Sequence, residues 1–168
     1  FGPFLPYVRS GLQKLEALEF ERVCVSHGPV LSNSGVLAEV LRFYHEWSKE
    51  KEKPAGKFIP VFFCSAYGNT ASIAESIKAG ICSVLKDADV MLFNIIEHDI
   101  CKQSTLLNSS DAFLIGTPTI NRDALPPVWQ LLSHVDAINI QKRPCAVFGS
   151  YGWSGEGVKV SEDIMKTM

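Results

Sequence analysis

Three short loops of this sequence are rich in hydroxyl, amide and glycine residues. Residues 65–70 read Ser-Ala-Tyr-Gly-Asn-Thr, residues 117–121 read Thr-Pro-Thr-Ile-Asn, and residues 149–155 read Gly-Ser-Tyr-Gly-Trp-Ser-Gly. Each loop follows an apolar run that predicts a buried strand. Ligands of open α/β sheets bind at the carboxyl ends of the strands, so the three loops predict one shared pocket.

The first loop has the chemistry to hold a phosphate monoester without a basic residue. Ser65 and Thr70 supply hydroxyls, Gly68 lets the backbone approach closely, and Asn69 can donate an amide hydrogen bond. The loop lacks the lysine of a GxxxxGK[ST] nucleotide loop and the spacing of a GxGxxG fingerprint. It therefore indicates a flavin mononucleotide (FMN) site, and an ordinary helix cap is the alternative.

The other two loops fit a planar ring. The backbone around Thr119 and Asn121 can bond the polar edge of an isoalloxazine, and Pro118 would stiffen that turn, although Thr-Pro also favours a plain turn. In the third loop, glycines let backbone N–H groups reach a flat ligand, and Tyr151 or Trp153 can stack on it. Either aromatic alone could instead pack inward.

The elements around these loops alternate between strand and helix. Apolar runs predict strands over 59–64, 89–95, 112–116 and 145–149, and helical spacing predicts helices over 70–86, 99–109, 126–135 and from 155 onward. Such alternation implies a parallel, doubly wound α/β sheet. Before it, two helices, the second around residues 36–44, flank a short strand over 22–26. A charged segment closed by Pro54 and Gly56 predicts a linker, with a domain boundary near Lys53.

The composition narrows the classes of function. The chain is 46% hydrophobic and 20% charged with a net charge of −2, so no basic surface favours nucleic acid or an anionic membrane. No apolar run is long enough to span a bilayer. None of the five cysteines forms a CxxC pair, and Cys64 and Cys145 lie in apolar runs. We expect buried free thiols in a reducing, cytoplasmic compartment.

The quoted loops resemble a known family. With their neighbours they read Ser-x-Tyr-Gly-Asn-Thr at 65–70, Gly-Thr-Pro-Thr-x-Asn at 116–121 and Phe-Gly-Ser-Tyr-Gly-Trp-Ser-Gly-Glu at 148–156, which is similar to the flavodoxin-like domain of flavodiiron proteins, or A-type flavoproteins. Ser-His-Gly-Pro at 26–29, with Tyr44 and Trp47 downstream, resembles the end of that family's metallo-β-lactamase-like domain.

The resemblance implies a fold and two domains. Residues 1–52 would be the end of the metallo-β-lactamase-like domain plus a linker, and residues 53–168 a flavodoxin-like FMN-binding domain. Its sheet would have the order 2-1-3-4, and we expect the family's fifth strand to be missing through truncation.

The resemblance also implies site residues. The residues expected to bind FMN are Ser65, Tyr67, Gly68, Asn69, Thr70, Pro118, Thr119, Ile120, Asn121, Ser150, Tyr151, Gly152, Trp153, Ser154 and Gly155. His27 matches the last histidine ligand of the family's di-iron centre. The other iron ligands precede Phe1, and His45, His98 and His134 fit no ligand pattern, so we expect a di-iron centre only in a longer parent protein.

The function implied is electron transfer. The flavin would take electrons from a redox partner, such as a rubredoxin or a flavin reductase, and pass them to a di-iron site that reduces O2 or NO, in a head-to-tail homodimer of the parent. This fragment alone would bind flavin and carry no catalytic residue.

Other functions compete with this one. The alternatives are a flavodoxin-like NAD(P)H:quinone or azo reductase, a stand-alone electron carrier and a purely structural α/β domain. A signalling receiver is excluded, because Ser65 and Thr117 stand where it requires acids.

Overall fold

The computed structural model describes residues 4–32, 35–49, 56–138, 140 and 142–168. Its backbone contacts divide the chain into two compact units, residues 1–53 and 54–168. Lys53 and most of the expected linker lie outside the described residues. No helix among the described residues has the length and apolar character needed to cross a bilayer.

The first unit is a pair of helices with a small β ribbon. Helix α1 (Leu5–Glu16) and helix α2 (Val36–Ser48) pack through the buried side chains of Leu12 and Leu37. The guanidinium of Arg9 donates to the carbonyl of Ser48 at 2.7 Å, which ties the two helices together. Strands β1 (Arg22–Val23) and β2 (Leu31–Ser32) pair antiparallel.

The second unit is built on a parallel sheet of four strands in the order β4-β3-β5-β6. The strands are β3 (Lys57–Phe63), β4 (Ala88–Asn94), β5 (Phe113–Pro118) and β6 (Cys145–Ser150). This order confirms the predicted 2-1-3-4 topology. The predicted apolar run forms the central strand β3, and Val61 and Phe62 are fully buried in it.

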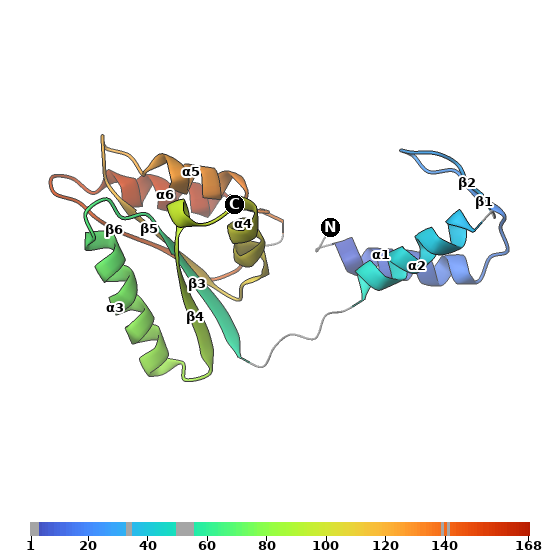
Figure 1. Cartoon of the computed structure of the whole chain (residues 1–168), viewed down its shortest axis with the longest axis horizontal. Coiled ribbons are helices and arrows are strands. Elements are labelled where there is room, and N and C mark those ends of the chain that lie inside the picture. The colour runs from blue at the N-terminus through green and yellow to red at the C-terminus, as the bar shows by residue number, and fades with distance from the viewer. Residues whose placement is uncertain (1–3, 33–34, 50–55, 139, 141) are drawn as a thin grey trace. The chain divides into compact units, whose positions relative to one another are not determined.

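Helices cover both faces of this sheet (Figure 1). Helix α3 (Asn69–Val84) packs on one face against Val61, Phe63 and Val90. The other face carries α4 (Ile100–Ser109), α5 (Pro126–Ser133) and α6 (Glu156–Thr167), which bury a larger core around Phe62 and Phe113. A short 3-10 helix (Ile95–Glu97) follows β4.

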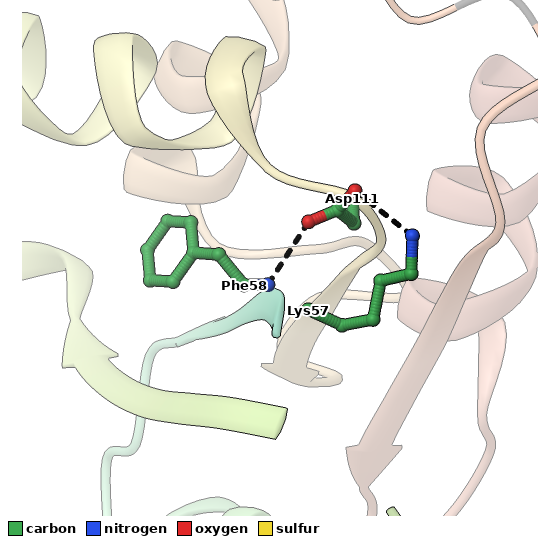
Figure 2. Close-up of polar contacts among 3 residues, drawn as sticks. All are labelled: Lys57, Phe58 and Asp111. Atoms are coloured by element: carbon green, nitrogen blue, oxygen red, sulfur yellow. Dashed lines mark hydrogen bonds and ion pairs between the residues drawn. The ribbon is translucent and has the colours of Figure 1, made fainter. Parts of the chain in front are cut away.

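Asp111 aligns the amino-terminal edge of the sheet (Figure 2). Its carboxylate accepts from the backbone N–H of Phe58 at 3.0 Å and lies 3.4 Å from Nζ of Lys57, and its own N–H donates to the carbonyl of Phe58 at 2.9 Å. These contacts hold the chain before β5 against the start of β3. Pro60 has no backbone N–H to donate to a neighbouring strand. Because the pairing of β3 with β5 begins only at Val61, its absence breaks no hydrogen bond between these two strands.

Several expected boundaries differ from the structure. Strand β1 ends at Val23 rather than Ser26, and α5 ends at Ser133, which leaves Val135 beyond the helix. Strands β5 and β6 run on through Pro118 and Ser150, so the first residues of the second and third loops belong to strands.

The expected burial of the cysteines is only partly right. The described cysteines are free, as expected, but only Cys64 is buried. Cys145 is exposed because β6 is an edge strand of the described sheet. Cys24 and Cys101 are also exposed, and Cys82 is half-buried.

Candidate cofactor-binding site

The first loop leads from β3 into the amino terminus of α3. Gly68 precedes the helix with a φ of 85°, a left-handed conformation that glycine adopts without strain. The N-cap residue Gly68 has no side chain to cap the helix, and no acid lies in the first helical turn. The partial positive charge of the helix end is thus offered to an anion.

The hydroxyls of the first loop organise the loop itself. Oγ of Ser65 accepts from the N–H of Ala71 at 3.3 Å. Thr70 is 1% exposed, and its Oγ1 lies 2.8 Å from Oγ of Ser150. The first and third loops therefore meet, through a partly buried hydrogen bond between hydroxyls. Tyr67 and Asn69 stay exposed on the surface of the loop.

The second loop is a tight turn at the end of β5. The backbones of Ile120 and Asp123 bond each other in both directions at 3.1 Å, and Asn121 and Arg122 between them have φ values of 54° and 62°. Two left-handed residues in succession are the geometry of a type I′ turn. For residues other than glycine this backbone is strained, and such strain concentrates at functional sites.

The second and third loops are also joined. The N–H of Thr119 donates to the carbonyl of Ser150 at 2.9 Å, and Oγ1 of Thr119 accepts from the N–H of Gly157 at 3.1 Å. A Cβ at Gly157 would stand 2.9 Å from the carbonyl oxygen of Asp123, so only glycine allows this approach. The three loops therefore form one connected edge.

The aromatic side chains of the third loop point outward. Trp153 is 98% exposed and Tyr151 is 64% exposed, so neither packs into the core. The ring of Tyr151 lies over Gly155, where an added Cβ would come within 3.1 Å of it. A hollow of about 250 Å³ is lined by Thr119, Asn121, Arg122, Trp153 and Ser154. The exposed ring of Trp153 and the strained turn at Asn121 and Arg122 therefore line the same hollow.

These residues suit a flavin mononucleotide. A Cβ added at Gly68 or at Gly152 would meet no atom within 4 Å, so the backbone there faces open space that a ligand can fill. The start of α3, which has a glycine at its N-cap and no acid in its first turn, suits a phosphate, and the hollow between the second and third loops suits a ring. Pro118 is buried in β5, and Ile120 is 40% exposed at the turn.

Two charged residues at this edge escaped the sequence analysis. Arg122 lines the hollow, and Glu156 begins α6 just behind the third loop. The Ser154 hydroxyl and the backbone N–H of Glu156, with a smaller contribution from Arg122, hold the pKa of the Glu156 carboxyl below its usual range. Glu156 closes the motif at 148–156 but was not singled out as a site residue, Arg122 stands in no motif, and only the folded turn brings the two close.

A second hollow lies on the other side of the first loop. It measures about 400 Å³ and is lined by residues that include Ser65, Gly68, Asn94, Glu97 and His98. The amide of Asn94 donates to Glu97 at 2.6 Å, while its Oδ1 is buried without a partner. This pocket could not be predicted from the sequence, because Asn94 ends β4 and His98 follows it in a segment that carries no motif.

The candidate metal ligand lies apart from the three loops in sequence and belongs to the first unit. His27 is exposed in the turn between β1 and β2. Among the described residues, no three His, Cys, Asp or Glu side chains gather where they could hold a metal ion. The first unit also has a hollow of about 690 Å³, lined by five leucines of α1, α2 and the segment after α1 and by polar residues that include Glu16, Glu19, Glu21 and His45.

The chain is similar to proteins of known family. The model of the Flavodoxin family matches residues 61–167. The flavo-diiron protein FprA2 of Clostridium acetobutylicum is 46% identical over 158 residues, which are 94% of this chain and 39% of that protein. This chain thus spans well under half the length of that relative.

Solved structures of flavodiiron proteins and flavodoxins are also similar to this chain. The flavodiiron core of Flv1 from Synechocystis superposes with a TM-score of 0.57 at 30% identity, over 98% of this chain and 40% of that one. An archaeal flavodoxin superposes with a TM-score of 0.57 at 31% identity, over 66% of this chain and 73% of that one. The resemblance, the flavodoxin-like fold and FMN as the expected cofactor are confirmed.

Proposed function

The chain belongs to the flavodoxin family, and from that premise we propose that it is the electron-transfer part of a flavodiiron oxidoreductase. Residues 54–168 bind FMN and pass its electrons to a di-iron site elsewhere in the parent protein, where O2 or NO is reduced. The observation that carries the proposal is the junction of three loops at one sheet edge, where Ser150 bonds both Thr70 of the first loop, at 2.8 Å, and Thr119 of the second, at 2.9 Å.

The first loop holds the phosphate in this proposal. The backbone N–H groups at the start of α3 face the anion, and the amide of Asn69 adds a donor. Ser65 and Thr70 keep the loop in shape through their bonds to Ala71 and Ser150. Tyr67 and Gly68 border the phosphate.

The second and third loops hold the ring. The polar edge of the ring meets backbone groups of the second loop, from Pro118, Thr119, Ile120 and Asn121. Trp153 or Tyr151 stacks on the face of the ring. The rest of the third loop lets the chain approach the ring closely, through Ser150, Gly152, Ser154 and Gly155. Bound FMN accepts electrons from a donor and releases them to an acceptor. The part of this chain is to position the ring and exclude water from it.

The first unit supports the flavodiiron parent over a stand-alone carrier. Its residues 1–52, with His27 as an iron ligand, form the end of the metallo-β-lactamase-like domain in this proposal. The similarity to FprA2 covers 94% of the chain and so includes this unit. In the parent, a cytoplasmic head-to-tail homodimer receives electrons from a rubredoxin or a flavin reductase.

A titration with FMN tests the proposal through the Asn69→Asp variant. Asn69 is the first residue of α3, where a negative charge favours the helix, so the variant should fold as well as the wild type. The same charge repels a phosphate. We expect quenching of FMN fluorescence by the wild type and binding at least tenfold weaker in the variant.

Riboflavin, which has no phosphate, is the internal control. Its binding should change little in Asn69→Asp, and Gln130→Glu, an equal charge change on the exposed side of α5, should bind FMN normally. A wild-type protein that leaves FMN fluorescence unchanged would refute the proposed function. Equal loss of FMN and riboflavin binding would show that the first loop does not hold the phosphate.

A further inference from the structure

Arg122 occupies an unusual position at the candidate site. It stands at the tip of the turn between Ile120 and Asp123 with a φ of 62°, and it is the one charged residue among the five that line the hollow beside Trp153. The turn is braced from behind, because the Asp123 carboxylate accepts from Ala124 N–H at 2.7 Å and from the indole N–H of Trp129 at 3.2 Å. This bracing fixes the backbone that carries the guanidinium.

Arg122 makes no close ion pair among the described residues, although acids lie near it. It helps to lower the pKa of the Glu156 carboxyl, and it also lines a second hollow, of about 560 Å³, together with Asp123 and Asp163. None of these acids lines the hollow assigned to the ring, where Arg122 is the one charged residue.

We propose that Arg122 stabilises the reduced form of the bound flavin relative to the oxidised form and so raises its reduction potential. This inference rests on the proposed FMN site. Two-electron reduction with uptake of one proton gives the neutral ring one negative charge, with the electrons coming from the donor that reduces it. A cation beside the ring favours the charged product, and charge near the ring is a lever by which proteins tune flavins.

The test measures the potential of FMN bound to the intact chain, by titration with a chemical reductant and a reference dye. Arg122→Gln removes the charge and keeps a side chain of similar length. We expect it to bind oxidised FMN within twofold of the wild type and reduced FMN about tenfold more weakly. For a two-electron couple, that difference lowers the midpoint potential by about 30 mV.

Two further variants separate charge from structure. Arg122→Lys keeps the cation and should keep most of the wild-type potential. Lys86→Gln removes an equal charge between α3 and β4, at the opposite edge of the sheet, and should change nothing. Added salt should shrink the difference between Arg122→Gln and the wild type, because the side chain is exposed.

The outcomes are distinct from those that test the FMN site. If the wild type binds FMN and Arg122→Gln has an unchanged potential, the inference is wrong and the proposed function stands. Equal weakening of both redox forms would make Arg122 a general contact and would also overturn the inference. A wild-type chain that binds no FMN would refute the proposed function, and this inference with it.

Discussion

At the scale of single residues, Trp153 is the side chain whose role can be separated from folding. It is 98% exposed, so its removal opens no cavity. If it stacks on the flavin ring, Trp153→Ala should raise the FMN dissociation constant about tenfold, equivalent to ~1.4 kcal/mol, with the midpoint of urea unfolding unchanged. Tyr7→Ala, another exposed aromatic but in the first unit, is the control. An unchanged dissociation constant would remove Trp153 from the site.

Cys64 is the one fully buried cysteine among the described residues. Loss of hydration raises the pKa of its thiol to about 11, so only about 0.1% is thiolate at pH 8. We expect iodoacetamide to label Cys24 and Cys101 in the native protein and to leave Cys64 unmodified, as read by peptide mass spectrometry. Labelling of Cys64 at the rate of Cys101 would contradict its burial.

The same shift gives Cys64 a defined effect on stability. The folded-state pKa lies above the unfolded one, so the neutral thiol favours folding below pH 9, and this contribution is lost as the pH rises toward 11. Cys64→Ala should therefore lose less stability than the wild type between pH 8 and pH 11 in urea unfolding.

At the scale of elements, the contact of Asp111 with β3 sets the start of the sheet (Figure 2). Asp111→Ala leaves the N–H of Phe58 without this acceptor and should lower the free energy of unfolding by about 2 kcal/mol. Asp111→Asn keeps an acceptor oxygen and should lose less. Lys57→Gln removes only an exposed ion pair and should cost under about 1 kcal/mol in the same urea experiment. Equal losses in Asp111→Ala and Lys57→Gln would contradict this assignment.

The elements themselves could be predicted because their patterns are local. The apolar run before Ser65 and the helical spacing after Thr70 each identify one element and the loop between them. The second loop was harder, because Thr117 and Pro118 are typical turn residues, yet pairing with β6 extends β5 through both. Strand ends depend on a neighbour that the local sequence does not contain.

Only the parts of the site that carry sequence motifs could be predicted from the sequence. The sequence indicated which loops would meet, but the Thr70–Ser150 bond and the cation at Arg122 depend on the packed backbone. Cys145 shows the same limit, because an apolar run predicts burial, whereas exposure at a sheet edge follows from the strand order.

At the scale of the whole molecule, the two units differ in how much core they bury. Both large apolar clusters belong to residues 54–168, as do all the residues assigned to FMN. In the described part of the first unit, Leu12 and Leu37 are the buried apolar side chains. A core of that size is too small to stabilise a domain of about fifty residues alone.

This difference in buried core predicts how each unit behaves when it is produced without the other. Residues 54–168 should unfold cooperatively by circular dichroism and bind FMN within about twofold of the full chain, since they hold both clusters and all three loops. Residues 1–53 should show no cooperative thermal transition. Asn69→Asp in the shorter chain is the control and should weaken FMN binding as it does in the full chain. Loss of FMN binding by folded residues 54–168 would mean that the first unit contributes to the site.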